Sequence, residues 1–130
     1  MILVDTSVLI AIRSVILPAA SIALSAVSYG ELRFGIERAR TPEERRTRTA
    51  RLAQLEDMFP ARWLPYDERA AESNGRLAAI VARTRSKHAR TKDVMLAAHA
   101  HALGASFVTL NPKDFEPLAD EIEIIVPELR

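Results

Sequence analysis

The sequence predicts an α/β protein in which a central, mostly parallel sheet lies between helices. Two observations support this fold class. Short, mostly apolar runs at residues 2–4 and 106–110 are typical of strands that are buried on both faces of a sheet. Longer segments with helical patterning separate such runs, and alternating strands and helices favour parallel pairing through right-handed crossovers. The 130 residues contain no repeat or low-complexity tract, so we expect a single domain spanning residues 1–130.

Start and stop signals place the elements along the first half of the chain. They are a strand at residues 2–4, a helix at 8–12 capped by Thr6 or Ser7, a strand at 22–24, and a helix from a Ser25 or Ser28 cap to about residue 40. The clearest helix start in the sequence is at residues 41–44. Thr41 can cap a helix that has Pro42 at its first position and Glu44 three residues after the cap, as in a capping box. That helix should end near residue 59.

The second half of the chain predicts further helices and strands in alternation. They are a short strand at residues 62–65, a helix at 67–84, a helix at 94–103 capped by Thr91 and closed by Gly104, a strand at 106–110, and an edge strand at 122–126. The helix after Thr91 is nearly all apolar, which indicates that it lies inside the molecule.

Composition excludes several classes of protein. The absence of cysteine excludes disulfides and thiolate metal sites, and the net charge of +1 does not by itself point to a partner. The uncharged stretch at residues 14–27 contains Pro18 and is shorter than the ~20 apolar residues of a spanning helix, so we expect a cytoplasmic protein without membrane association. The sequence has no P-loop and no glycine-rich fingerprint. A haloacid-type phosphatase would carry a second aspartate where Ser7 stands.

Four carboxylates stand beside apolar, strand-like or helix-like sequence: Asp5, Glu31, Asp93 and Asp114. Asp5 and Asp114 follow expected strands, at the end of a parallel sheet where ligands bind. Glu31 and Asp93 lie on helices that would pack over those strands. If the fold gathers these acids, a divalent cation is their natural neutraliser, and oxygen ligands favour Mg²⁺ or Mn²⁺. Such a site could support phosphodiester hydrolysis.

Each acid also has an interpretation without chemistry. Asp5 could cap the next helix, Asp114 could be an ordinary loop acid, and the helix dipole favours an acid such as Asp93 in a first turn. Glu31 could be a surface residue paired with Arg33 or Arg38. The apolar residues that wrap its helix favour burial instead; they are Val27, Leu32, Phe34 and Ile36.

Basic, aromatic and imidazole side chains are less specific signals. Arginine collects at residues 33–51 and 83–92, which indicates solvated helix faces or a phosphate-binding rim. His99 and His101 are two residues apart on one helix, so they cannot share a face, and we expect packing or surface roles for both. His88 lies in a basic run and is expected to be solvated. Three aromatic residues could stack bases but suit packing better: Phe59, Trp63 and Tyr66.

Four blocks in the same order resemble the PIN-domain ribonucleases, specifically the VapC toxins of bacterial toxin–antitoxin pairs. The blocks are VDTSVLIA, LSAVSYGELRFG, KDVMLAAHAHALGASFVT and NPKDF, and together they cover nearly the whole chain. The resemblance implies a three-layer α/β/α PIN-like fold. It also implies a metal site in which Asp5 and Asp93 are the principal ligands, while Glu31 and Asp114 complete the site or help to bind a second ion. The polar helpers implied are Thr6, Ser7 and Asn111.

The activity implied by this resemblance is Mg²⁺- or Mn²⁺-dependent cleavage of RNA, often tRNA or another structured RNA, silenced by a VapB-like antitoxin. We therefore expect an endoribonuclease toxin of a type II pair that forms a homodimer and a hetero-oligomer with its antitoxin. We assign RNA phosphate contacts to the basic residues Arg83, Arg85, Lys87, Arg90 and Lys92. Two alternatives are a catalytically silent PIN-like binding or regulatory module and a metal-dependent DNase.

Overall fold

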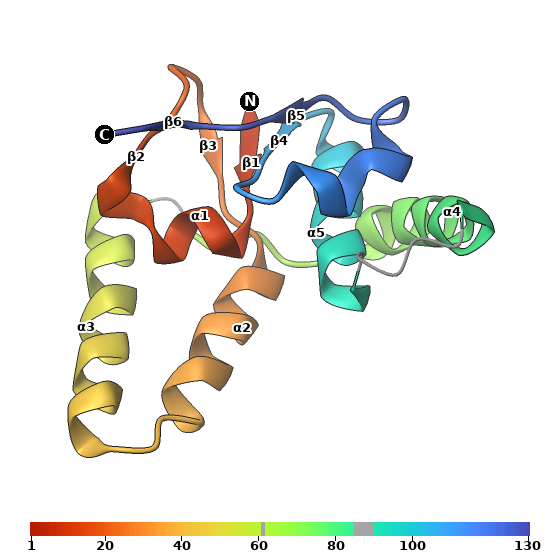
Figure 1. Cartoon of the computed structure of the whole chain (residues 1–130). Coiled ribbons are helices and arrows are strands. Elements are labelled where there is room, and N and C mark those ends of the chain that lie inside the picture. Colours follow the sequence, from red (N-terminus) through yellow and green to blue (C-terminus); the bar gives the residue numbers. More distant parts are fainter. Residues whose placement is uncertain (61, 85–89) are drawn as a thin grey trace.

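The computed structural model describes residues 1–60, 62–84 and 90–130, and its centre is a parallel sheet. The strand order is β3-β1-β4-β5, with the bounds Ile22–Ala23, Ile2–Val4, Ser106–Val108 and Ile124–Ile125. β1 pairs in parallel with β3 on one side and with β4 on the other, and β4 pairs in parallel with β5. The predicted parallel sheet is therefore confirmed, with β1 in its interior (Figure 1).

Side chains of the central strands alternate between two hydrophobic cores, because successive residues of a strand point to opposite faces. Leu3 and Phe107 belong to one core with residues of α4 (Glu68–Thr84) and α5 (Thr91–Leu103). Ile2, Val4 and Val108 belong to the other, with residues of α1 (Thr6–Ile10), α2 (Ala26–Glu37) and α3 (Pro42–Met58). The sheet thus lies between two helical layers, as the sequence predicts.

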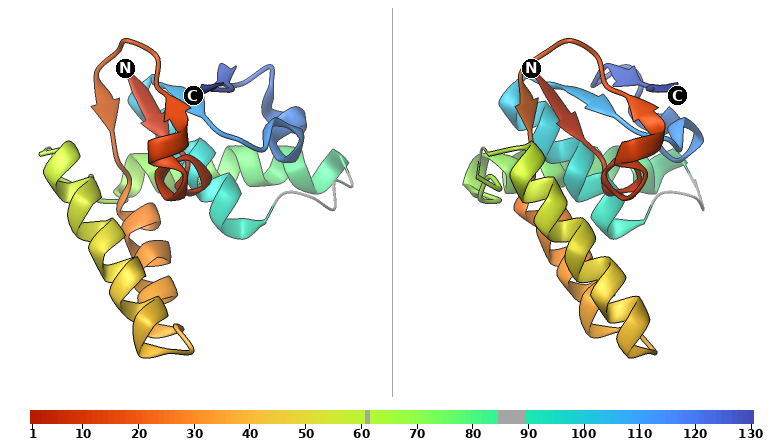
Figure 2. Two further views of the ribbon diagram at one scale, coloured as in Figure 1. Left: turned by 60° about the vertical axis from the view of Figure 1, so that its left-hand side comes forward. Right: turned by 90° about the vertical axis from the view of Figure 1, so that its left-hand side faces the viewer.

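Helices α2 and α3 form an antiparallel pair that extends away from the sheet (Figure 2). The turn between them contains the predicted cap: Thr41 Oγ1 accepts a hydrogen bond from the Glu44 backbone N–H at 3.0 Å, and Glu44 Oε2 accepts one from the Arg40 N–H at 2.9 Å. Arg48 then joins the two helices by donating to the Gly35 carbonyl at 2.6 Å. Within the described residues, no helix is long and apolar enough to cross a bilayer.

Two helix starts differ from the prediction. Asp5 occupies the N-cap position of α1, so Thr6 and Ser7 lie within its first turn, and the helix ends at Ile10 before a 3-10 turn at Ile12–Ser14. Arg90, and not Thr91, precedes α5. The reason is that the carboxylate of Asp93, the third helical residue, accepts a hydrogen bond from the Arg90 N–H at 3.3 Å, which draws the helix start back by one residue.

Three strand predictions also need correction. The segment at residues 62–65 contributes a single bridge between Leu64 and Ser25. The strands near residues 106–110 and 122–126 are shorter than expected. The chain then makes an antiparallel pair of β6 (Glu128–Leu129) with β2 (Val15–Ile16), which the sequence did not indicate, since two-residue strands carry no readable alternation.

Candidate active site

Asp5 follows β1 directly and is 4% exposed. Its Oδ2 accepts hydrogen bonds from Thr109 Oγ1 at 2.7 Å and from Ser7 Oγ at 2.9 Å, whereas its side chain makes no cap hydrogen bond to α1. Burial raises the pKa of the Asp5 carboxyl. The hydrogen bonds from Thr109 and Ser7 oppose that rise, and the negative charge of Asp114 adds to it. Asp5 therefore occupies the cap position with its backbone, while the hydroxyl groups of Thr109 and Ser7 hold its carboxylate.

Glu31 lies in α2, and Thr6 holds its side chain. Thr6 Oγ1 donates to Glu31 Oε1 at 2.8 Å and also shares a hydrogen bond of 2.8 Å with Ser28 Oγ. The predicted alternative, a surface pair with Arg33 or Arg38, is wrong. Arg33 pairs with Glu37 at 3.5 Å, and the Arg38 guanidinium lies 5.9 Å from the ring centroid of Phe34. Glu31 is thus linked to the first turn of α1, next to Asp5.

Asp93 and Asp114 approach from the other layer of the fold. Asp93 is in the first turn of α5, and Asp114 is in the 3-10 segment Pro112–Leu118 that follows β4. Burial raises the pKa of Asp93, and the negative charges of Asp5, Asp114 and Glu31 raise it further, against the lowering effect of the hydrogen bond from the Arg90 N–H. Four carboxylates from four separate segments therefore act on one another electrostatically.

The same four acids line one pocket of about 860 Å³. We call it the acidic pocket. Its remaining lining comes from the polar helpers, the start of α5 and two apolar side chains: Thr6, Ser7, Asn111, Arg90, Thr91, Lys92, Ile10 and Phe34. Burial is the main cause of the raised pKa values of Asp5 and Asp93, and repulsion between the negative charges that share this partly buried space adds to it.

The donor set of the acidic pocket fits a hard divalent cation in kind, because it consists of carboxylate oxygens with hydroxyl and amide groups nearby. Its arrangement is open: among residues 1–60, 62–84 and 90–130, no three acids or imidazoles converge closely enough to hold one ion. Asp5, Glu31 and Asp93 are each held by their own donors, which are Thr109 and Ser7, Thr6, and the Arg90 N–H respectively.

The basic residues assigned to RNA binding divide into three groups. Arg90 and Lys92 line the acidic pocket. Arg83 is exposed near the end of α4 and is not part of the pocket lining. Arg85 and Lys87 lie outside the described residues, as does His88.

Histidine and aromatic side chains are engaged in packing contacts. His99 is buried and its Nδ1 is 2.8 Å from Ser25 Oγ, and His101 Nδ1 is 3.0 Å from Ser73 Oγ. Trp63 stacks at an angle on Tyr29 with ring centroids 5.4 Å apart, and Tyr66 meets His99 edge-on. These contacts agree with the packing roles that the sequence favours.

Sequence reasoning missed three residues of this region. Thr109 holds Asp5, Ser28 supports Thr6, and Phe34, which was expected to help bury Glu31, is instead 56% exposed. The hydroxyl in the strand end VTLN was the available signal for Thr109, because a buried threonine needs a partner. Helical spacing was the signal for Ser28, which stands three residues before Glu31 and faces the same side of α2.

Comparison with known proteins gives a consistent result. A family model described as the PIN domain matches residues 2–121. The solved structure of VapBC-5 from Mycobacterium tuberculosis, a member of the VapBC family of toxin–antitoxin systems, is 26% identical, with a TM-score of 0.74 over 97% of this chain and 96% of that chain. DNA-bound VapBC from Salmonella typhimurium is 25% identical, with a TM-score of 0.72 and 96% of each chain covered.

A third structure, VapBC2 from Rickettsia felis bound to a DNA fragment from its promoter, has a TM-score of 0.79 at 17% identity. It covers 98% of this chain and all of that chain, and at this identity it supports the fold alone. A search of curated proteins found no match.

Proposed function

The chain belongs to the PIN-domain family, and from this premise we propose that it is a VapC-type nuclease toxin that cleaves RNA with the help of Mg²⁺ or Mn²⁺. The observation that carries the proposal is the acidic pocket, where carboxylates from four distant segments meet at the end of a parallel sheet. The full-length similarity to VapBC chains supports the toxin assignment. RNA, and structured RNA such as tRNA in particular, is the proposed substrate class.

In this proposal Asp5 and Asp93 are the principal metal ligands, and Glu31 and Asp114 complete the set. A bound divalent ion would polarise a phosphoryl oxygen and lower the pKa of a nearby water. The protein's own residues keep the acids oriented: Thr109 and Ser7 hold Asp5 through Oδ2, and Thr6 holds Glu31 through Oε1. Asn111, which also lines the pocket, offers an amide for contact with the substrate.

The cationic side chains at the start of α5 have a separate role in the proposal. Arg90 and Lys92 line the same pocket as the acids, so they would neutralise the phosphates that flank the one under attack. This division explains how an anionic pocket accepts an anionic substrate. The acids require a cation to be present, while Arg90 and Lys92 would contact the rest of the RNA backbone.

The decisive experiment is incubation of the purified protein with total RNA and Mg²⁺ or Mn²⁺, with and without chelator. We expect metal-dependent cleavage that Asp5→Asn and Asp93→Asn each abolish, whereas Asp120→Asn, which changes an exposed acid outside the pocket lining, serves as the matched control and retains activity. Thermal unfolding gives an independent readout, because metal that binds the folded state should stabilise the wild type more than either variant.

Cleavage in chelator, or full activity of Asp5→Asn, would contradict this proposal. DNA cleavage in a parallel substrate panel, without RNA cleavage, would replace ribonuclease by DNase. A protein that shows neither hydrolysis nor metal stabilisation would be the silent binding module.

For partners, we propose a VapB-like antitoxin, a homodimer of this chain and a hetero-oligomer of the two proteins, acting in the cytoplasm. The antitoxin would lay an apolar helix in a groove of this chain and direct an Arg or Lys toward the acids. Light scattering of the protein alone and with the product of the adjacent reading frame tests both assemblies. A monomer in both samples would contradict the proposal.

A further inference from the structure

Phe34 is an exposed aromatic side chain at the border of two cavities. It lies one turn after Glu31 on α2, and 56% of it is accessible to solvent. It lines the acidic pocket and also a second cavity of about 630 Å³ whose lining comes from α1, α2, α3 and the turn between α2 and α3. Its helix neighbours Leu32 and Ile36 are buried, so its exposure follows from its place on the helix and not from a loosely packed segment.

Two cations from different elements lie over the Phe34 ring. The guanidinium of Arg38, the residue that follows α2, is 5.9 Å from the ring centroid, and Lys92 Nζ, at the start of α5, is 5.3 Å from it. Both distances are within the range of a cation–π contact. Both side chains are long and exposed, so either can move from the ring to another anionic or aromatic group at small cost.

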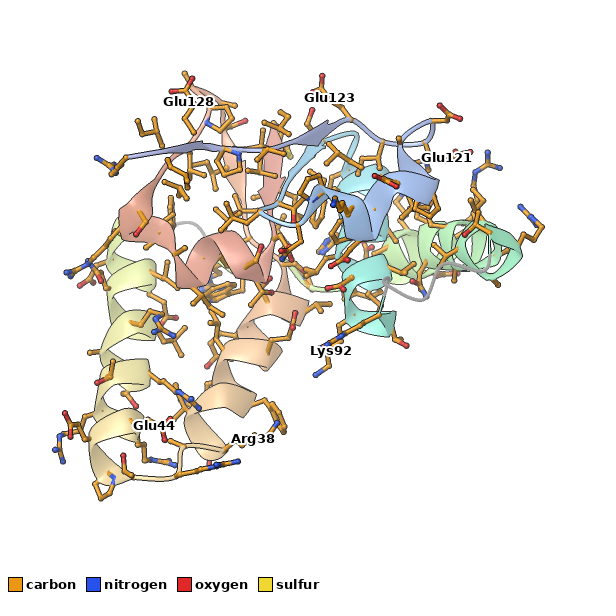
Figure 3. The ribbon with its side chains drawn as sticks, viewed as in Figure 1. Arg38, Glu44, Lys92, Glu121, Glu123 and Glu128 are labelled. Carbon is orange, nitrogen blue, oxygen red and sulfur yellow. The ribbon has the colours of Figure 1, made fainter. Side chains whose placement is uncertain are left out.

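Further basic residues continue the positive surface along the second cavity. Arg40 and Arg51 line it together with Arg38, while Arg48, also in the lining, is engaged with Gly35 and Glu44. Figure 3 shows Arg38 and Lys92 on the same side of the molecule, at the outer end of α2 and at the start of α5. Glu44, which pairs with Arg48, lies beside Arg38, and Glu121, Glu123 and Glu128 lie on the opposite side. Arg38 and Lys92 at the ring, continued by Arg40 along the second cavity, thus offer several cations to the phosphates of a long anion.

We propose that Phe34 is a stacking platform for a nucleobase of single-stranded RNA, whose neighbouring phosphates contact Arg38 on one side and Lys92 on the other. The inference rests on the proposed function in taking RNA as the ligand, and it adds the residue that selects unpaired nucleotides. A base paired within a duplex cannot present its face to a side chain, whereas an unpaired base can stack on an exposed ring.

The surroundings of the ring favour a polynucleotide over an apolar peptide. An apolar helix that covered Phe34 would gain from the ring and from Ile10, but it would bury Arg38 and Lys92 against a surface with nothing to pair with them. A polynucleotide supplies a partner for the ring and for the cations, because each nucleotide carries one π-face and one negative charge.

The test is equilibrium binding of a fluorescently labelled oligouridylate to the full chain, measured by anisotropy in the presence of chelator so that no cleavage occurs. Phe34→Leu keeps an apolar side chain and removes the π-face. It should weaken binding by roughly 5- to 100-fold, and Phe34→Trp should retain wild-type affinity or exceed it. An oligomer with abasic sugars should bind the wild type and Phe34→Leu equally, since it has no base to stack.

Tyr29→Leu is the matched control, because Tyr29 is on the same helix, is 37% exposed and lines neither cavity. It should leave the affinity unchanged. Arg38→Gln and Lys92→Gln should instead reduce the slope of log affinity against log salt, which Phe34→Leu should not change. Thermal unfolding of each variant checks that the fold is intact.

Equal binding of oligouridylate by the wild type and Phe34→Leu would overturn the platform, and so would an equal loss for abasic and base-containing oligomers. In that case the exposed ring of Phe34 would be interpreted as a contact for a protein partner. The outcome is separable from the proposed nuclease function. Phe34-dependent binding without metal-dependent cleavage would refute the nuclease alone, and Asp5-dependent cleavage with Phe34-independent binding would refute the platform alone.

Discussion

Replacement of Thr109 by valine tests how the buried carboxylate of Asp5 is held. Thr109 is fully buried, donates to Asp5 Oδ2 at 2.7 Å and accepts from the Asn111 N–H at 3.1 Å. Valine keeps its shape without the hydroxyl that makes both bonds. A hydrogen bond to a charged group contributes about 1.5–3 kcal/mol. Ser7 remains as a second donor to the same oxygen, so we expect Thr109→Val to lower the free energy of unfolding by about 2 kcal/mol at pH 7.

A double-mutant cycle with Asp5→Asn isolates the charge. A hydrogen bond between neutral groups contributes about 1 kcal/mol, so Thr109→Val should cost about 1 kcal/mol less in the Asp5→Asn background than in the wild type. The assay is urea denaturation of the four proteins in chelator. Equal costs of Thr109→Val in both backgrounds would refute a charge-assisted bond.

Acidification provides a second check with a definite sign. The pKa of Asp5 is raised by burial, so the folded state binds more protons than the unfolded state in the window above the ordinary pKa of an aspartate, and stability falls as pH rises through it. Loss of the Thr109 donor raises that pKa further. The difference in stability between the wild type and Thr109→Val should therefore shrink as Asp5 becomes protonated. A difference that grows at low pH would contradict the assignment.

Three further predictions concern stability, each measured by denaturation. Gly104→Ala should cost about 1 kcal/mol, since φ at Gly104 is +67° while no described heavy atom lies within 4 Å of the added Cβ; a neutral result would show that the backbone relaxes. Phe107→Ala should cost about 3–5 kcal/mol, because Phe107 is fully buried and packs edge-on against Phe115; a loss under 1 kcal/mol would mean that the core collapses into the space. Burial lowers the pKa of His99, so the free energy of unfolding should stay constant above the unfolded-state pKa near 6.5 and decline as pH falls below it. His99→Gln should flatten that decline. Identical pH profiles of the wild type and the variant would exclude His99 as its source.

Features that depend on near neighbours in the chain were predictable. The Thr41 cap, the Ser25 cap and the left-handed Gly104 each follow from a residue type and its local partners, and the structure confirms all three. The arrangement of the sheet between two helical layers was also predictable, because apolar strands that are buried on both faces require helices on both sides. The four acids could also be named, Asp5 and Asp114 from the strands before them, Asp93 from its helix start and Glu31 from the apolar residues of its helix, and the structure brings them to one pocket.

Features that depend on distant contacts were not predictable from pattern. Thr109 reaches Asp5 across 104 positions, and no local periodicity encodes that pairing. Phe34 has the same helical spacing as an apolar core position, and only the packing of α2 against its neighbours decides that Leu32 and Ile36 are buried while Phe34 is not. The position of the N-cap of α5, Arg90 and not Thr91, depended on the hydrogen bond that Asp93 accepts from the Arg90 N–H. The sequence pattern does not distinguish these two adjacent residues.

The place of β1 in the interior of the sheet has a consequence for biosynthesis. Its partner β4 comes more than a hundred positions later, so Asp5 leaves the ribosome well before Thr109 and Asp114 exist. A nascent chain, or a fragment that stops short of β4, lacks the strand that closes the middle of the sheet and two residues of the pocket lining, Asn111 and Asp114. The interior of the sheet and the complete acidic pocket can therefore form only after most of the chain has been made.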